Sequence, residues 1–269
     1  MHPRVSLHQV CFPESASVAD DLRATADAGF SRVGLWGRKI GPLPVTTTKE
    51  LLSTYDLTVS TISHGPLFAP DEPERDDEFR AAAMRTLDIA AALPSATVYC
   101  LSGGGAWSSW DDLARAFVEF SAPVATYARE LGIPLLLEAT LPLHREVSFL
   151  HSLRDTMDLA AAAGLGVVLD VFPIWAERGL ERQIRDRAAL VGLCQVCDYA
   201  VGTQRLPARR VPGDGDIPVR QFIEWLLDAG YEGGFELEIQ SPELEAEGIA
   251  RGAARAGEWL SDVLDELGA

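Results

Sequence analysis

Lysine is nearly absent from this 269-residue chain. Its 23 basic residues comprise 21 arginines and only two lysines, Lys39 and Lys49, against 40 acidic residues. Enzymes that form a Schiff base or bind pyridoxal phosphate need a positioned lysine amine, so these chemistries lose most of their candidates. The net charge of −17 leaves no broad cationic surface for a phosphodiester backbone. We therefore expect no nucleic-acid partner.

Long hydrophobic runs and a cysteine framework are also missing. No stretch reaches the roughly 18 uncharged apolar residues of a membrane-spanning helix. Four cysteines are too few for a disulfide scaffold in a chain of this size, which agrees with a reducing compartment. Cys194 and Cys197 have CxxC spacing, but a strand would point them to opposite faces, where they neither form a disulfide nor share a metal. We predict a cytoplasmic protein with no membrane contact.

The sequence does contain a regular alternation of strands and helices. Eight short β-rich runs begin roughly 25 to 42 residues apart, and segments with helical periodicity separate them. The runs cover residues 5–12, 32–37, 57–65, 96–103, 133–140, 165–172, 192–199 and 234–240. No Gly-rich dinucleotide turn follows the first run, and no linker divides the chain. We predict an α/β protein with a single (β/α)8 TIM barrel domain over residues 1–269.

Three helical features are specific enough to test. Ser17, followed by Asp20, predicts a capped helix start. A long helix is expected over residues 112–131, and Pro123 marks a point where it can break. Residues 243–267 carry an apolar stripe at helical spacing, which predicts one amphipathic helix at the C-terminus.

Acidic side chains interrupt the later strands near their C-terminal ends, where TIM barrels carry their active sites. Strand alternation points Glu138, Asp170 and Gln195 into the barrel, and also Glu236 with Glu238. A carboxylate inside a barrel costs several kcal/mol unless it is paired or bound to a cation, and no Lys or Arg lies within these strands. The all-oxygen set predicts Mg²⁺ or Mn²⁺ rather than Zn²⁺. For any single residue, a helix cap or an ion pair with a loop arginine stays open as the alternative.

These residues stand in segments with a familiar order. LLLEAT, GVVLDVFPIW, CQVCDY, RRVPGDGDIP and GYEGGFELEI follow one another along the second half of the chain. This order resembles the sugar phosphate isomerase/epimerase family, the xylose isomerase-like TIM barrels that include tagatose epimerases, hydroxypyruvate isomerase and inosose dehydratase. The resemblance implies one divalent metal ion, Mn²⁺ or Mg²⁺ with Co²⁺ as a third candidate. Its ligands would be Glu138, Asp170, Gln195 and Glu238.

The chain departs from the family pattern at two positions. Family members often have His where this chain has Gln195, and again where it has Pro173. An amide oxygen still ligates a hard cation, so the first change alters metal preference. The second removes a contact to the substrate or to a metal ligand, so a relative's substrate cannot be assigned directly.

The resemblance also implies a reaction, which is proton transfer at a carbon beside a carbonyl. A metal on the substrate oxygens stabilises the enediolate, with Glu138 and Glu238 as acid and base. We expect an isomerase or epimerase of a small keto-sugar or polyhydroxy compound. The alternative is a metal-dependent lyase on the same scaffold, either a dehydratase of keto-inositol or dehydroshikimate type, or a 3-keto-glycoside deglycosidase acting by β-elimination. An endonuclease IV-like barrel and a sugar-binding barrel without turnover are the other readings.

Several histidines and tryptophans are further site candidates. His64 follows the third strand and is the candidate for a separate acid or base. His8 faces inward in the first strand as a substrate contact, with a buried structural histidine as the alternative. Trp36, Trp107 and Trp175 lie at or beyond strand ends, where we expect them to wall a substrate.

One arginine completes the set. The resemblance places an arginine in the loop after the seventh strand near the substrate, and we assign this role to Arg210, which would bind a carboxylate, phosphate or polyol. An ion pair with Asp214 or Asp216 is the alternative. A small carbohydrate-like substrate is the expected partner, and the sequence leaves open whether the chain forms a homo-oligomer.

Overall fold

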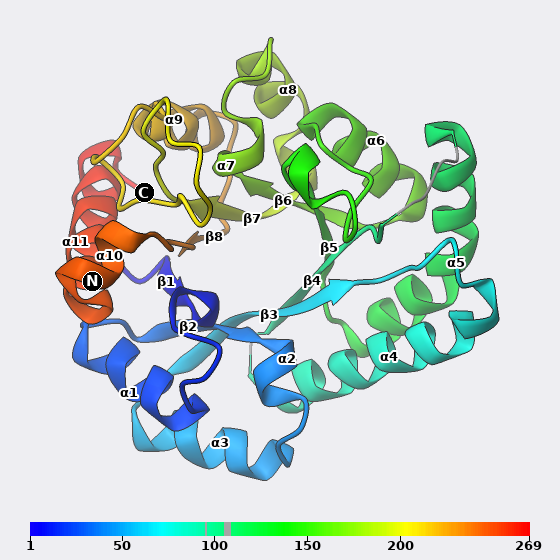
Figure 1. The fold of residues 1–269 in the computed structure, drawn as a ribbon, viewed down its shortest axis with the longest axis horizontal. Coiled ribbons are helices and arrows are strands. Elements are labelled where there is room, and N and C mark those ends of the chain that lie inside the picture. The colour runs from blue at the N-terminus through cyan, green and yellow to red at the C-terminus, as the bar shows by residue number, and fades with distance from the viewer. Residues whose placement is uncertain (95, 105–108) are drawn as a thin grey trace.

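The fold is a closed barrel of eight parallel strands in the order β1 to β8, with helices around the outside (Figure 1). The computed structural model describes residues 1–94, 96–104 and 109–269. The strands are β1 Val5–His8, β2 Arg32–Trp36, β3 Thr58–Pro66, β4 Thr97–Leu101, β5 Leu135–Glu138, β6 Gly166–Asp170, β7 Val191–Val196 and β8 Gly234–Leu237. Every expected β-rich run overlaps one of them, which confirms the predicted (β/α)8 barrel.

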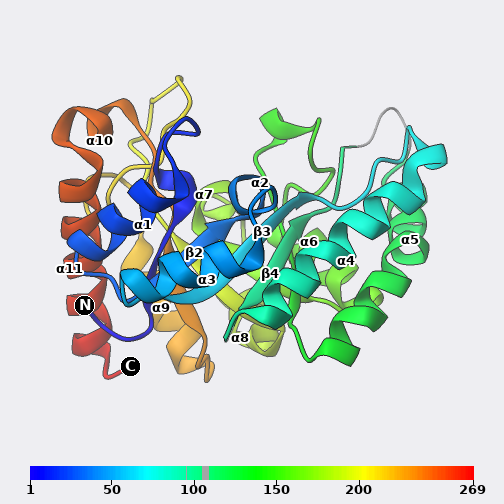
Figure 2. The ribbon, with the colours of Figure 1, turned by 90° about the horizontal axis from the view of Figure 1, so that it is seen from below.

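The helices alternate with these strands along the chain. They are α1 Val18–Asp27, α2 Gly37–Ile40, α3 Val45–Thr54, α4 Asp76–Ala92, α5 Trp110–Leu131, α6 Leu153–Ala163, α7 Val171–Ile174, α8 Leu180–Arg187, α9 Val219–Asp228, α10 Pro242–Glu247 and α11 Ile249–Leu267. None of these helices is long and apolar enough to cross a membrane. Figure 2 shows α2, α7 and α10 toward one end of the barrel and both chain termini toward the other.

Two of the three helical predictions need correction. The Ser17 hydroxyl accepts a hydrogen bond from the Asp20 backbone N–H at 3.1 Å, which confirms the cap of α1. Helix α5 passes through Pro123 without a break, because this proline lies on the exposed side, where the carbonyl it leaves without a partner faces solvent. The terminal segment forms two helices, α10 and α11, because the chain turns at Gly248 with a positive φ of 97°.

The barrel interior has an apolar side and a polar side. Tyr99, Leu136, Val168 and Leu193 project inward from β4 to β7 and form a small cluster apart from the main core. On the other side, β8, β1 and β3 contribute Glu236 and a group of hydroxyl side chains. The alternation that places Leu136 and Val168 inside also points the next inward residues, Glu138 and Asp170, into the barrel near the strand ends.

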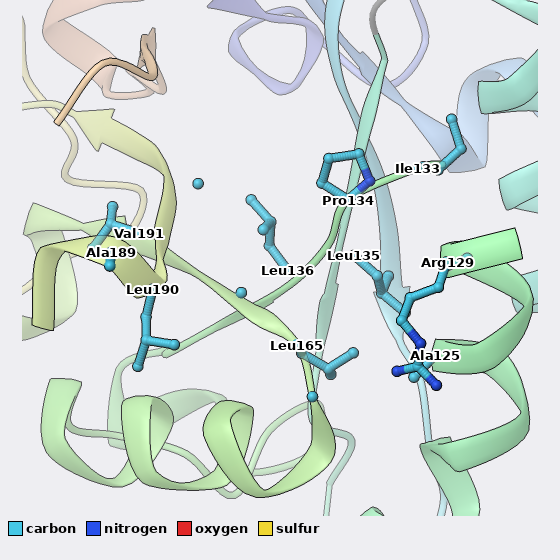
Figure 3. Close-up of a pocket in the computed structure, with 14 residues that line it drawn as sticks. Ala125, Arg129, Ile133, Pro134, Leu135, Leu136, Leu165, Ala189, Leu190 and Val191 are labelled. Atoms are coloured by element: carbon cyan, nitrogen blue, oxygen red, sulfur yellow. The ribbon is translucent and has the colours of Figure 1, made fainter. Parts of the chain in front are cut away.

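Leu136 fills space at the N-terminal end of the barrel. Strands β6 and β7 begin at or near glycines, and a Cβ at Gly166 or Gly192 would lie 2.5 or 2.7 Å from Leu136 Cδ2. A cavity of about 280 Å³ lies at this end and is lined mainly by small and aliphatic residues (Figure 3). In TIM barrels this end serves stability, so the functional site is expected at the opposite end.

Candidate active site

Three carboxylates converge inside the C-terminal end of the barrel. Glu138 and Asp170 end β5 and β6, and Glu238 follows β8, where its backbone N–H still donates to Val196 at 3.2 Å. One carboxylate oxygen from each lies within 4.8 Å of the other two. Glu138 is 6% exposed and Asp170 2%. The structure thus brings together the three carboxylates predicted as metal ligands.

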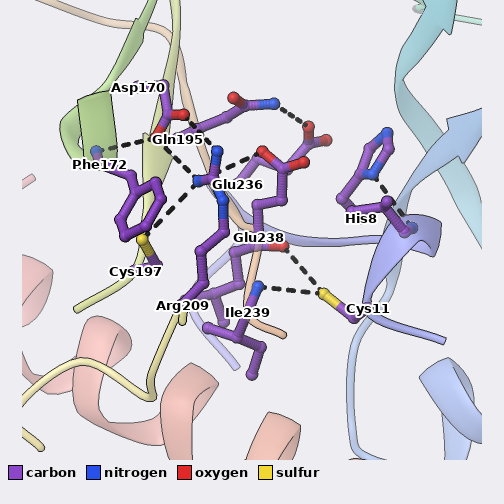
Figure 4. Close-up of polar contacts among 12 residues, drawn as sticks. His8, Cys11, Asp170, Phe172, Gln195, Cys197, Arg209, Glu236, Glu238 and Ile239 are labelled. Atoms are coloured by element: carbon purple, nitrogen blue, oxygen red, sulfur yellow. Dashed lines mark hydrogen bonds and ion pairs between the residues drawn. The ribbon is translucent and has the colours of Figure 1, made fainter. Parts of the chain in front are cut away.

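Gln195, the fourth predicted ligand, reaches the same point from β7. One end of its amide lies 3.1 Å from Glu238 Oε2 and 3.2 Å from Glu138 Oε1, and the other end lies 3.2 Å from the Tyr99 hydroxyl. The second end also lies 3.5 Å from Glu236 Oε1 (Figure 4). Gln195 therefore sits between the two proposed acid/base residues, and the role of its amide depends on which atom faces them.

Arg209 supplies a positive charge that the strand sequences do not contain. Its guanidinium donates to both oxygens of Asp170, at 3.0 Å from Nη1 and 2.6 Å from Nη2, and Nη1 lies 3.5 Å from Glu238 Oε2. The Phe172 ring packs against it, with the guanidinium carbon 4.6 Å from the ring centroid. Asp170 also accepts from the Phe172 backbone N–H at 3.0 Å. Asp170 is thus fixed on both of its oxygens.

The loop that delivers Arg209 is built around Asp198. This buried carboxylate accepts hydrogen bonds from four backbone N–H groups of the loop over residues 199–217, at 2.8 to 3.0 Å. Asp198 also pairs with Arg210 through two backbone hydrogen bonds, and Arg209 pairs in the same way with Gln240. The backbone at Arg209 and Arg210 is therefore extended, and consecutive side chains point to opposite sides.

The buried charges shift one another's proton affinities. Burial, together with the neighbouring carboxylates of Glu238 and Asp170, raises the pKa of Glu138 well above its usual range. Burial also raises the pKa of Asp170, although Arg209 opposes the shift. Burial alone would lower the pKa of Arg209, but Asp170 and Glu238 outweigh it and raise that pKa. The guanidinium is charged, and burial shifts both Glu138 and Asp170 toward the protonated form.

Glu236 points inward as predicted but belongs to a different environment. Its Oε2 accepts hydrogen bonds from Ser6 at 3.3 Å, Ser60 at 2.9 Å and Thr61 at 2.6 Å. A side chain at Gly34 would collide with this carboxylate, so the glycine makes room for it. Three hydroxyl donors stabilise Glu236 without a cation, and it is not part of the three-carboxylate cluster.

A cavity of about 340 Å³ opens beside the carboxylates. Glu138 and Arg209 line its polar part, and the apolar part is lined by Leu141, Phe172, Pro173, Leu206 and Pro207. Its volume falls within the roughly 300–1,000 Å³ range of small-molecule sites. The Pro173 that departs from the family pattern is one of the wall residues.

The two histidine candidates lie in different places. His64 faces α4 and not the barrel interior. Its Nδ1 lies 2.9 Å from the Thr86 hydroxyl on α4, and burial, with Arg85 nearby, lowers the pKa of His64 to about 4. The prediction of His64 as an acid or base at the barrel mouth is therefore corrected. His8 does point inward, but it is buried beneath the cluster, with Nε2 3.2 Å from the Tyr99 hydroxyl.

The tryptophan and arginine candidates are not part of the carboxylate cluster. Trp36 lies at the end of β2, with the Lys39 amine 6.0 Å from its ring centroid. Trp175 packs on Tyr199, at 6.3 Å between ring centroids. Trp107 lies outside the described residues. Arg210 pairs with Glu243 at 2.9 Å, in place of the alternative partners Asp214 and Asp216.

Sequence reasoning missed three residues of the site. Arg209 takes the place assigned to its neighbour, Phe172 lines the cavity instead of Trp175, and Tyr99 contacts Gln195 from β4. Phe172 lies in α7, just after β6 ends at Asp170, so strand alternation does not place it. Arg209 depends on the extended pairing of its loop, which no local pattern signals.

The donor set fits a hard divalent cation. If all three carboxylates are ionised, Arg209 leaves two negative charges uncompensated within the cluster. A carboxylate has more than two lone-pair positions, so Asp170 can bind Arg209 and a cation together. Every ligand atom is oxygen, which matches Mg²⁺ or Mn²⁺.

Comparison with known proteins shows where this barrel belongs. A protein from Streptomyces coelicolor named "Putative hydroxypyruvate isomerase" is 28% identical over 241 residues, which is 81% of this chain and 83% of that protein. D-psicose 3-epimerase from Clostridium cellulolyticum H10, solved with D-tagatose, has the same fold at 19% identity, with a TM-score of 0.81 over 97% of this chain and 99% of that one. The IolI protein, solved with a zinc atom, has the same fold at 14% identity, with a TM-score of 0.83 over 98% and 99%. The family model of the xylose isomerase-like TIM barrel matches residues 22–263, and the chain belongs to this family.

Proposed function

We propose that this protein is a divalent-metal-dependent isomerase or epimerase of a small keto-sugar or polyhydroxy carbonyl compound. The observation that supports it best is the convergence of Glu138, Asp170 and Glu238, of which Glu138 lines a cavity of small-molecule size. Relatives named as a hydroxypyruvate isomerase and a D-psicose 3-epimerase point to the same class of substrate.

The three carboxylates would hold one Mn²⁺ or Mg²⁺ ion. When bound, the ion supplies Lewis-acid stabilisation of negative charge on the substrate's carbonyl and adjacent hydroxyl oxygens. The protein's part is to fix the ligands in advance. Asp170 is held by Arg209 and by the Phe172 N–H, and Glu138 is held in the strand β5.

Glu138 and Glu238 would move the proton. They come from β5 and β8 and flank the Gln195 amide, at 3.2 and 3.1 Å, so a substrate above Gln195 would have one carboxyl group on each side. One removes the proton beside the carbonyl to give an enediolate, and the other returns a proton to the opposite face or to the neighbouring carbon. The raised pKa of Glu138 suits this residue to the role of proton donor.

Arg209 would orient the substrate. Its guanidinium carries more N–H groups than the two that reach Asp170, and it lines the cavity next to Glu138. The remaining donors suit hydroxyl, carboxylate or phosphate oxygens.

The lyase alternative has one observation in its favour. The cavity walls away from the carboxylates are apolar, with Phe172, Leu206 and Pro207 among them. A free small sugar has little apolar surface to pack against these side chains, whereas a 3-keto-glycoside would place its aglycone there. Elimination of that aglycone needs the same first step, which is proton removal beside a carbonyl.

Incubation in deuterated water distinguishes the two reactions. Purified protein with Mn²⁺ is mixed with ketoses, hydroxypyruvate or 3-keto-glycosides, and the products are analysed by NMR and mass spectrometry. A product with the same composition as the substrate, apart from incorporated deuterium, supports isomerisation or epimerisation. Release of water or an aglycone supports the lyase.

Carboxamide variants test the site itself. Glu138→Gln and Glu238→Gln should each lower the exchange rate by about 10²- to 10⁴-fold, because each removes a proton-transfer group. Glu243→Gln is the matched control, since Glu243 pairs with Arg210 at the surface. Full activity in both site variants, or no binding of Mn²⁺ or Mg²⁺ by the wild type, would disprove the proposal.

A further inference from the structure

The two ends of the Gln195 amide have different neighbours, and these neighbours determine which end is oxygen. The upper end faces Glu138 and Glu238, at 3.2 and 3.1 Å, and the lower end faces the Tyr99 hydroxyl at 3.2 Å. Amide oxygen and nitrogen are nearly equal in size, so the surrounding hydrogen-bond donors and acceptors decide the orientation.

A backbone amide fixes the direction of hydrogen bonding below Gln195. The Val10 N–H donates to His8 Nδ1 at 3.1 Å, so that nitrogen carries no hydrogen. In a neutral imidazole the hydrogen then lies on Nε2, which is 3.2 Å from the Tyr99 hydroxyl and donates to it. Tyr99 is buried, and its own hydroxyl hydrogen points to its other polar neighbour, the lower end of Gln195. An acceptor is required there, which is the amide oxygen.

We infer that Gln195 is a hydrogen-bond donor that bridges Glu138 and Glu238, and that it is not a ligand of the cation. With its oxygen on Tyr99, the amide NH₂ group faces both carboxylates within hydrogen-bonding distance. The inference rests on the proposed function, because that function requires a cation, and the ligands of this cation are then Glu138, Asp170 and Glu238.

The reverse orientation is poorer on two counts. It places the amide oxygen against two carboxylate oxygens and leaves the Tyr99 hydroxyl hydrogen without an acceptor. It gains one contact, from the amide nitrogen to Glu236 Oε1, at the long distance of 3.5 Å. Gln195 is thus a positioning residue, which holds the acid/base pair at a fixed separation through two N–H donors.

Neutron diffraction on the metal-free, deuterated protein tests the direction of this chain. We expect deuterium on His8 Nε2, the Tyr99 hydroxyl deuterium directed at Gln195, and the amide ND₂ facing Glu138 and Glu238. Deuterium on His8 Nδ1, or the amide oxygen facing the carboxylates, would overturn the inference. This measurement holds whether or not the protein binds a metal, so it is independent of the proposed function.

An X-ray structure of the Mn²⁺-loaded protein tests the ligand set. The manganese position is read from its anomalous signal. An amide atom of Gln195 within about 2.6 Å of the ion would make it a ligand and overturn the inference, and a longer distance supports it. If the wild type takes up no Mn²⁺, the proposed function fails, and the neutron result still decides the amide direction.

Calorimetric titration with Mn²⁺ gives a second test through Tyr99→Phe. Removing the hydroxyl frees the amide to turn its oxygen toward the ion, so Mn²⁺ should bind equally well or up to about tenfold more tightly. If Gln195 were a ligand supported by Tyr99, the same variant would weaken binding, and a loss of about threefold or more overturns the inference. Tyr127→Phe is the matched control, because that hydroxyl bonds Asp88 on the surface.

Discussion

Arg209 and Arg210 are adjacent in sequence but have opposite surroundings, which makes them a matched pair for mutation to methionine. Arg209 donates to both oxygens of Asp170, whose side chain is 1% exposed. Arg210 pairs with Glu243, whose side chain is 59% exposed. Methionine preserves much of the aliphatic stem in both cases, so the two variants differ mainly in the charge pair that each removes.

The expected cost follows from burial. Removing one partner of a buried ion pair leaves an uncompensated charge and typically costs about 3–5 kcal/mol. Asp170 can partly escape this cost by taking up a proton, so we expect about 3 kcal/mol for Arg209→Met. A surface pair contributes about 0–1 kcal/mol, which is the expected cost of Arg210→Met.

Urea unfolding at pH 7 after treatment with a chelator measures both values. Mn²⁺ is then added, and a bound ion should stabilise either protein through mass action, by about 2.7 kcal/mol at 100 times its Kd. The ion should help Arg209→Met at least as much as the wild type, since it restores a positive charge beside Asp170. Equal costs for the two variants would refute the role of Arg209 as the buried counter-ion. A smaller gain from Mn²⁺ in Arg209→Met would refute the shared site.

Two further predictions concern residues outside the carboxylate cluster. Burial, with Arg85 nearby, lowers the pKa of His64 to about 4, from about 6.5 in the unfolded chain. The folded state therefore favours neutral His64, and this contribution to stability is complete above pH 6.5. It is lost as the pH falls toward 4, by at most about 3 kcal/mol. His64→Gln should flatten this part of the curve of unfolding free energy against pH, and parallel curves for variant and wild type would contradict the assignment. Asp198→Ala removes the acceptor of four backbone N–H groups, so it should cost about 3 kcal/mol in urea unfolding and lower activity by misplacing Arg209. Asp214→Ala is its surface control, and an Asp198→Ala protein as stable and active as this control would show that other contacts hold the loop.

The fold and part of the candidate site follow from local patterns in the sequence. Eight β-rich runs with helices between them lead to a barrel, because parallel neighbours need a crossover connection of this length. Within a strand the side-chain period is two, so the inward direction of Glu138 and Asp170 follows from counting. The same count puts Glu236 inside, but it does not show that hydroxyls from β1 and β3 would bind it.

The errors arise where the chain leaves its strands. Arg209 and Arg210 differ only in which side of an extended loop they occupy, and that loop is set by Asp198 and by pairing with Gln240. Two adjacent arginines give no local signal of which one faces the carboxylates. His64 is a different case. Strand β3 shifts its register against β2 between Val59 and Thr61, so Ser60 and Thr61 both reach Glu236. Counting along the strand sequence therefore does not show that His64 faces α4.

The internal carboxylates differ in how their charge is met, and this difference separates structural from reactive groups. Glu236 is satisfied by three hydroxyls, and Asp170 by Arg209 and a backbone N–H. Among the residues that the structure describes, the side-chain donors that reach Glu138 and Glu238 are the neutral amide of Gln195 and, at 3.5 Å from Glu238, the guanidinium of Arg209. The two carboxylates left without a full counter-ion are the pair placed to exchange protons with a substrate. A bound cation therefore has its greatest electrostatic effect where the proposed chemistry takes place.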